Sequence, residues 1–292
     1  MSDAESHEHE FGTEPIDGHV TGNGVRLHYF DWGRAPSPAI ILLHGGGLTA
    51  HSWDVVCDLL RGEYRCVALD LRGHGDSGWA PDVEYALEAH AADLRAVVDS
   101  LSLDRFVVVG HSLGGLIALT FAGRSGDRLL GLVLVDTGPH RARLAGRERL
   151  RAFMDGPQEH ATVEEFVERA LLFNPRRPRE RLRRSLLHNL RRTPRGTWAW
   201  KYDRRIADPF RSGDQEARYQ RLIAAAGTVR CPVLVVQGEE SEHFHPEDAE
   251  ATAALFRSGR WIGIPGAGHT VQGDRPYDLT RVLREFLSAT LA

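Results

Sequence analysis

One segment of the chain reads Phe106-Val-Val-Val-Gly-His-Ser-Leu-Gly-Gly115. Its first residues, 106–109, form a short apolar run rich in β-branched side chains, which is typical of a strand buried on both faces. Residues 113–123 are apolar nearly all round, which predicts a buried helix. A Gly-x-Ser-x-Gly turn between such elements holds its serine in a strained backbone conformation and lifts the hydroxyl above the strand end. The segment therefore predicts that Ser112 is a catalytic nucleophile.

Short apolar runs bounded by turn residues recur on both sides of this segment. They are Ala39–Leu43, Cys66–Leu69, Leu132–Val135, Val233–Val236 and Trp261–Ile264, preceded by an alternating run over Val25–Trp32. Helical patterns lie between them at 52–60 and 87–101, and a further one at 279–287 closes the chain. Strands that alternate with helices predict crossover connections and a parallel sheet. We therefore expect an α/β fold with a mostly parallel central sheet flanked by helices.

The alternation stops between residues 137 and 227, where the sequence is rich in arginine, helical in pattern and interrupted by prolines. Strand signals resume at Cys231. This organisation predicts a core formed by residues 16–136 and 228–292, with a helical cap at 137–227 inserted over the carboxyl edge of the sheet. Residues 1–15 are polar, and we expect a disordered tail there.

Composition and charge exclude several classes of protein. The chain has 292 residues and a formal net charge of −4, which argues against nucleic-acid binding. No apolar run is long enough to span a membrane, and the polar start does not resemble a signal peptide, so we expect a cytoplasmic protein. The three cysteines are widely separated, which favours reduced core residues over a disulfide framework. His243 and His245 are too few ligands for a metal site, and we expect neither metal nor cofactor.

Two glycine-rich loops follow predicted strands and suggest partners for Ser112. In the loop 44–47, His-Gly-Gly-Gly, the amide of Gly46 is placed to hold an oxyanion together with the amide of Leu113. We expect Gly45 and Gly47 to line the substrate site beside it.

The second loop, 265–269, reads Pro-Gly-Ala-Gly-His and directly follows the last predicted strand. Its His269 can fold back over the sheet edge toward Ser112 and act as the general base. We expect His111, beside the nucleophile, to point elsewhere and to be structural.

Together these motifs resemble the α/β-hydrolase fold family over nearly the whole chain after the first fifteen or so residues. They are HGGG at 44–47, DLRGHGDS at 70–77, GHSLGG at 110–115, LVLVDTGP ending at Pro139 and PGAGH at 265–269. The resemblance implies the fold more strongly than the reaction, because the family includes esterases, lactonases, C–C hydrolases, epoxide hydrolases, dehalogenases and some lyases. Serine rather than aspartate at 112 argues against the epoxide hydrolases and dehalogenases.

The resemblance leaves the acid of the triad open. The family usually carries an aspartate three residues after the glycine that ends the penultimate strand, which is Gly238 here, and that position holds Ser241. Some members place the acid at the end of the preceding strand, which here is Asp136. We favour Asp136, with Glu242 as the second choice and Glu240, or no acid, as the third.

The predicted function is a serine hydrolase that cleaves an ester, lactone or thioester of a small, apolar or aromatic substrate. Aromatic residues of the cap suggest this preference, and we expect Trp200 to contact the substrate. They include Phe153, Phe166, Phe173, Trp198, Trp200, Tyr202 and Phe210. A biosynthetic lyase, cyclase or acyltransferase and a C–C bond hydrolase remain alternatives, and an inactive ligand receptor is a weaker one.

Overall fold

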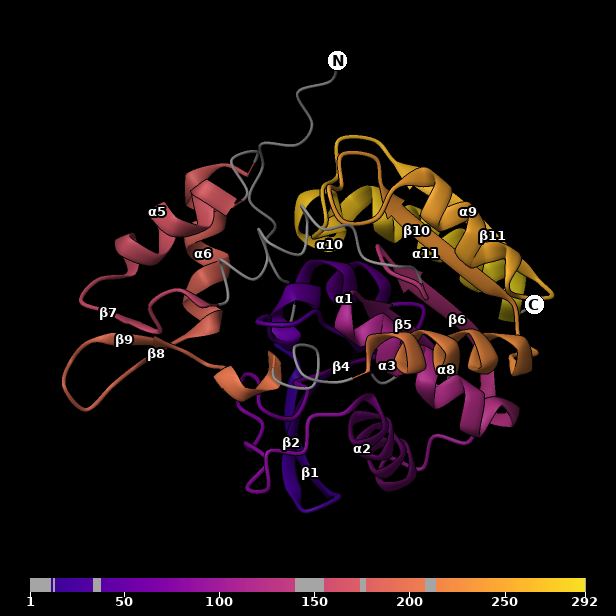
Figure 1. Cartoon of the computed structure of the whole chain (residues 1–292), viewed down its shortest axis with the longest axis horizontal. Helices are drawn as coiled ribbons and strands as arrows, with labels where there is room; N and C mark the ends of the chain where they lie inside the picture. The colour runs from indigo at the N-terminus through magenta and orange to yellow at the C-terminus, as the bar shows by residue number, and fades with distance from the viewer. Residues whose placement is uncertain are drawn as a thin grey trace.

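A sheet of eight strands forms the centre of the computed structural model, in the order β1-β2-β4-β3-β5-β6-β10-β11 (Figure 1). The structure describes residues 12, 14–33, 38–139, 155–173, 177–207 and 214–291. The strands are β1 (Ile16–Gly22), β2 (Val25–Trp32), β3 (Ala39–Leu43), β4 (Arg65–Leu69), β5 (Phe106–His111), β6 (Leu129–Val135), β10 (Val233–Gly238) and β11 (Gly259–Ile264). β2 runs antiparallel to β1 and β4, and the pairs from β4 onward are parallel, which confirms the predicted sheet.

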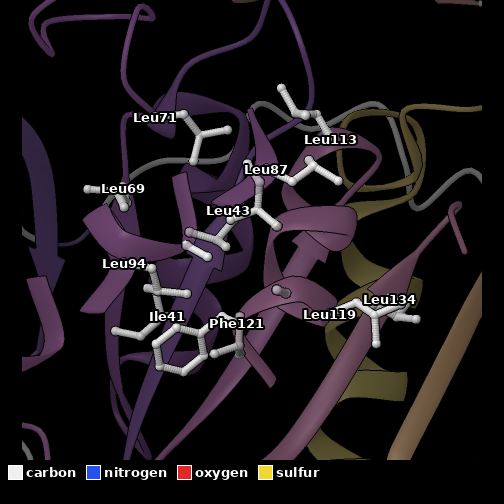
Figure 2. Packing of buried hydrophobic residues seen from close by; sticks show 14 of the residues in the cluster. Ile41, Leu43, Leu69, Leu71, Leu87, Leu94, Leu113, Leu119, Phe121 and Leu134 are labelled. Atoms are coloured by element: carbon white, nitrogen blue, oxygen red, sulfur yellow. The ribbon is translucent and has the colours of Figure 1, made fainter. Parts of the chain in front are cut away.

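The central strands of this sheet, such as β3, β5 and β10, are buried on both faces. Successive side chains of a strand point to opposite sides, so each strand contributes to two clusters. In β3, Ile41 and Leu43 belong to one hydrophobic cluster, whereas Ile40 and Leu42 belong to the other. Helices α2 (Leu87–Ser100), α3 (Leu113–Ser125), α8 (Gln215–Thr228) and α9 (Pro246–Ala254) contribute to the first cluster, part of which Figure 2 shows. Helices α1 (Asp54–Leu60) and α11 (Pro276–Leu291) cover the opposite face.

Shorter elements complete the core. They are the 3-10 turns η1 (Ala50–Trp53) and η2 (Gly126–Arg128) and the helix α10 (Val271–Asp274), whereas the 3-10 turn η3 (Arg204–Ala207) lies in the insertion between β6 and β10. All three cysteines are free, and two of them are fully buried. Within the described ranges, no helix combines the length and apolar character needed to cross a membrane.

The insertion between β6 and β10 contains the helices α5 (Val163–Phe173) and α6 (Arg179–Asn189) and a small antiparallel sheet. The strands of that sheet are β7 (Glu159–His160), β8 (Leu190–Arg192) and β9 (Trp198–Trp200), in the order β7-β9-β8. This small sheet was not expected from the helical pattern of the insertion. Its strands are only two or three residues long, so they show no usable alternation.

Helix α8 lies beside α3 of the core, away from α5 and α6, although our boundary at residue 227 assigns it to the cap (Figure 1). The two helices approach so closely that a Cβ atom at Gly123 would lie 2.7 Å from the Cβ of Ala225. Leu222 and Ala226 of α8 are buried in the core cluster. The apolar face of α8 therefore extends the helical layer of the core.

Residues 70–77, which follow β4, connect the core to the insertion. The buried guanidinium of Arg72 donates two hydrogen bonds to Asp93 of α2, at 2.5 and 2.7 Å, and a third to the carbonyl of Glu84 at 2.8 Å. On the insertion side, the amide of Asp203 donates to the carbonyl of Gly73 at 2.8 Å. Arg72 thus fixes the loop 70–77 to α2, and the insertion in turn bonds to this loop at Gly73.

We predict that Asp93→Asn lowers the free energy of unfolding by about 3–5 kcal/mol, because it leaves the Arg72 guanidinium buried without its counter-ion. Asp99 lies on the same helix and pairs with Arg128, but its side chain is 51% exposed, so Asp99→Asn is a matched control. That change should cost less than about 1 kcal/mol. Urea unfolding of both variants measures the difference, and equal midpoints would contradict the prediction.

Four buried histidines surround the carboxyl edge of the sheet: His44, His74, His90 and His111. Burial is the main cause that lowers the pKa of each of them, and it lowers the pKa of His74 to about 3. The folded protein therefore keeps these rings neutral. The unfolded chain protonates them below about pH 6.5. Acid consequently favours the unfolded state.

The free energy of unfolding should accordingly be greatest above pH 6.5 and fall as the pH drops toward 5, by about 1.4 kcal/mol per pH unit for each neutral buried histidine. Neither ring nitrogen of His90 has a hydrogen-bond partner within the described part of the chain. His90→Leu should therefore fold. It should reduce the dependence of the free energy of unfolding on pH by the contribution of one histidine. Urea unfolding at several pH values tests this, and an unchanged slope would show that His90 is not a source of the pH dependence.

Candidate active site

Ser112 occupies a sharp turn between the end of β5 and the start of α3. Its φ is +50°, a conformation that costs a non-glycine residue about 1–3 kcal/mol. The turn is held because the Ser112 amide donates to the carbonyl of Val135 at 3.0 Å and its own carbonyl accepts from Gly115 at 3.0 Å. The predicted strand, turn and helix are all present, and they present the hydroxyl at the carboxyl edge of the sheet.

Close backbone contacts explain the glycines around Ser112. A Cβ atom at Gly110 would lie 2.4 Å from the carbonyl oxygen of Gly114, and one at Gly114 would lie 2.4 Å from that of Leu43. Both distances are far shorter than a carbon–oxygen contact allows, and the obstacle is backbone that cannot rotate away. Any side chain at either position would push α3 away from β5 and β3, and the turn would open.

His269 lies in the loop between β11 and α10, and its ring reaches the serine. Its Nε2 is 3.1 Å from the Ser112 hydroxyl oxygen, and its Nδ1 is 2.7 Å from an oxygen of Asp136. Because a carboxylate only accepts, Nδ1 carries the proton and Nε2 presents its lone pair to the hydroxyl. This is the tautomer that a general base for Ser112 requires.

Asp136 follows β6 directly and is 1% exposed. Its φ is +52°, so the residue turns its carboxylate sideways across the end of β10. One carboxylate oxygen accepts the amide of Gly238 at 2.9 Å, and the other accepts the Ser241 hydroxyl at 2.6 Å in addition to His269. Three donors from two further segments therefore hold the charge in place.

Among the three acidic residues considered, the structure brings only Asp136 against the His269 ring. Glu240 and Glu242 are exposed on the loop after β10. Ser241, at the position where related sequences usually carry the acid, instead donates its hydroxyl to Asp136. A small side chain there leaves room for the Asp136 carboxylate to cross from β6. This role of Ser241 was not predicted from the sequence. A hydroxyl residue at the usual position of the acid could have indicated a donor to an acid carried by the preceding strand.

The loop 44–47 lies directly against the serine turn. A Cβ at Gly45 would approach a ring nitrogen of His111 to 2.7 Å and the Cβ of Ser112 to 3.3 Å, while Gly47 has a φ of +75°. A Cβ at Gly46 would lie 3.9 Å from a side-chain carbon of Leu113. The two residues predicted to supply oxyanion donors are therefore neighbours beside Ser112.

His44 orients this loop, a role that the sequence did not reveal. The Leu71 amide donates to its Nε2 at 3.0 Å, so its Nδ1 carries the proton and donates to the carbonyl of Gly45 at 2.8 Å. Burial lowers the pKa of His44, so the ring keeps this neutral form. The Gly45 carbonyl is thereby fixed, and with it the direction of the next amide in the loop.

A second carboxylate, Asp70, bonds to η1, which directly follows the same loop. It accepts the amide of Ala50 at 2.7 Å and a ring nitrogen of His28 at 2.7 Å. Burial tends to raise its pKa, but the His28 bond and the backbone amides of Ala50 and Asp76 outweigh burial and lower the pKa to about 2. The carboxylate therefore remains charged and ties β2 and η1 to the end of β4.

We expected His111 to point elsewhere, but its ring contacts the loop that carries the general base. Its Nε2 donates to the backbone carbonyl of His269 at 2.8 Å, and the two rings lie 4.8 Å apart. Trp200, for which we expected a substrate contact, packs within the insertion against Phe166, at 4.9 Å between ring centres, and near Tyr202. Phe153 and Phe210 lie outside the described residues.

Comparison with known proteins gives consistent matches. Residues 38–276 match the family model of the alpha/beta hydrolase fold. The chain is 33% identical to the esterase Rv0045c of Mycobacterium tuberculosis, over 88% of this chain and 84% of that protein. It is 29% identical to the 3-hydroxybutyrate-oligomer hydrolase of Cupriavidus necator, over 84% of this chain and 87% of that protein.

A solved α/β hydrolase from Novosphingobium aromaticivorans superposes with a TM-score of 0.80 at 27% identity, covering 94% of this chain and 98% of that one. The family-model match covers the sheet from β3 to β11, the serine turn and the His269 loop described above. The chain therefore belongs to the α/β hydrolase fold family of enzymes.

Proposed function

We propose that the protein is a serine esterase-type hydrolase that acts on an ester, lactone or thioester of a small, apolar or aromatic molecule. The observation that carries the proposal is the continuous series of contacts from Ser112 through His269 to Asp136, at 3.1 and 2.7 Å. A nucleophile, a base in the required tautomer and a buried carboxylate are the three parts of acyl transfer through a covalent intermediate. Two of the relatives are named as an esterase and an oligomer hydrolase.

In this mechanism the Ser112 oxygen attacks the carbonyl carbon while His269 Nε2 takes the hydroxyl proton. Asp136 keeps the ring oriented and stabilises its positive charge. The amides of Gly46 and Leu113 donate to the oxyanion of the tetrahedral intermediate. His269 then returns the proton to the leaving alcohol or thiol, and an acyl-serine remains. Water, deprotonated by His269, releases the acid and restores the serine.

Gly45 and Gly47 border the space in front of Ser112, where their lack of side chains gives a substrate carbonyl access to the loop. The substrate preference rests on the aromatic composition of the insertion, because apolar and aromatic side chains typically line the binding sites of apolar molecules. For Trp200 we retain the predicted substrate contact only as part of this proposal. The residues form a complete acyl-transfer site, and a catalytically inactive receptor would have no need to keep its serine and base in contact.

A fluorophosphonate probe should label the wild-type protein at Ser112, and Ser112→Ala should abolish both labelling and hydrolysis of p-nitrophenyl esters. Intact-mass spectrometry identifies the labelled species, and unfolding temperature verifies that the variant is folded. Labelling that survives in Ser112→Ala would rule out Ser112 as the nucleophile. Labelling without hydrolysis of any ester, lactone or thioester would favour the lyase, cyclase or acyltransferase alternative, which product analysis identifies.

A second prediction distinguishes the acids. Asp136→Asn should lower kcat by about 10⁴-fold, because an amide cannot stabilise the imidazolium and favours the wrong tautomer. Glu242→Gln is the matched control, since it makes the same chemical change in an exposed residue, and its kcat should stay near that of the wild type. Near-normal turnover in Asp136→Asn, or a large loss in Glu242→Gln, would overturn the assignment.

A further inference from the structure

Two histidines and an aspartate meet where the cap helix α6 passes the start of α1. His51 belongs to η1, Asp54 begins α1 and His188 lies near the end of α6. The two imidazole rings lie 4.0 Å apart between centres, and His51 Nδ1 is 2.8 Å from a carboxylate oxygen of Asp54. One nitrogen or oxygen atom from each residue can be chosen so that all three lie within 4.8 Å of one another.

This group, His51, Asp54 and His188, has bonding capacity that the described protein does not use. The second carboxylate oxygen of Asp54 is buried and has no hydrogen-bond partner among the described residues. His188, within the same ranges, contacts the His51 ring but makes no hydrogen bond through its own nitrogens.

The group can be reached by an ion from solvent, because His188 is exposed and His51 and Asp54 are half-buried. The amine of Lys201 pairs with Asp76 at 2.9 Å, which balances its positive charge. Metal ions require neutral imidazoles and ionised carboxylates, since protons compete for the same lone pairs.

We propose that His51, Asp54 and His188 bind a divalent transition-metal ion of the Zn²⁺ or Ni²⁺ type, with water completing the coordination. Two imidazole nitrogens and one carboxylate oxygen match the ligand set of such ions and not that of Mg²⁺ or Ca²⁺, which prefer oxygen. In a tetrahedral site with metal–nitrogen bonds of about 2.0 Å, ligand atoms lie about 3.3 Å apart. The ligand atoms, which lie within 4.8 Å of one another, would have to approach by up to about 1.5 Å to reach that separation. Side-chain rotation can supply this movement.

The ion would connect the cap to the loop that faces Ser112. η1 directly follows the loop 44–49, and Thr49 of that loop already donates its hydroxyl to the side-chain carbonyl of Asn189 at 3.1 Å. Asn189 is adjacent to His188. A metal bond beside this buried hydrogen bond would hold the end of α6 against η1. Binding should therefore raise the unfolding temperature, because the ion binds only the folded arrangement.

Other groups of potential ligands in the described part of the chain are less suited to this role. Asp17, His19 and His28 lie close together, as do His28, Asp70 and Asp76. Both groups depend on His28, whose Nδ1 is bonded to buried Asp70 at 2.7 Å. A metal there would disrupt the network that supports the loop 44–47. In the group at His188, the His51–Asp54 bond leaves the second carboxylate oxygen of Asp54 without a hydrogen-bond partner among the described residues.

The test is calorimetric titration of the untagged, full-length protein with Zn²⁺ at pH 7.5, with Mg²⁺ as a comparison. We expect one Zn²⁺ per chain and no heat from Mg²⁺. Even partners of metal ligands change affinity by about 10–100-fold, so removing a ligand by His188→Ala should weaken Zn²⁺ binding by about tenfold or more. Asp54→Asn should act in the same direction while keeping the shape of the side chain.

Two control variants make the result specific. His160→Ala removes a half-buried cap histidine outside the group, and His19→Ala removes a ligand of a competing group. Both should bind Zn²⁺ like the wild type and show the same rise in unfolding temperature, whereas His188→Ala should show no rise. Equal Zn²⁺ affinity in wild type, folded His188→Ala and Asp54→Asn, or loss of binding in His19→Ala, would overturn the proposal.

Discussion

The carboxylate of Asp136 joins three segments at the carboxyl edge of the sheet. It begins at the end of β6, accepts an amide and a hydroxyl from the end of β10, and contacts the ring of His269 after β11. A buried carboxylate is unfavourable unless its oxygens are occupied by donors, and here each donor comes from an element that the fold has already aligned. The positions of the base and of the β10 loop therefore depend on one charge. The backbone of Asp136 adopts the left-handed conformation, which is strained for a non-glycine residue and directs its carboxylate toward the end of β10.

The serine turn and the sheet were predictable because their signals are local. Residues 106–115 contain a strand, a turn and a helix in one continuous pattern, and Gly110 and Gly114 are explained by backbone contacts within and next to that segment. The parallel order followed from apolar runs separated by helical periods. The position of His269 followed from its place after the last strand.

Features that depend on contacts between distant segments were harder to predict. The preference for Asp136 over Glu242 rests on how the side chain crosses β10, which depends on a backbone angle that no pattern encodes. His44 and His111 have roles only because Leu71 and the His269 carbonyl come within reach of their rings. The small sheet of the insertion has strands too short to alternate, and α8 resembles the cap helices in composition. Nor did the sequence indicate that His51 and His188 lie together, because only the fold brings their rings into contact.

The segment that leaves the sheet after Asp136 also constrains how the insertion could be exchanged for another. Thr137 packs against Gly115, where an added Cβ would lie 2.3 Å from its methyl group, and a Cβ at Gly138 would lie 2.2 Å from the hydroxyl of Thr252. Residues 136–138 are thus enclosed by α3 and α9 and belong physically to the core. At the other end, α8 is equally part of the core. A chimaera that transplants a foreign cap should therefore join the two chains after residue 138 and before residue 214, so that the replaced segment is smaller than the sequence insertion suggests.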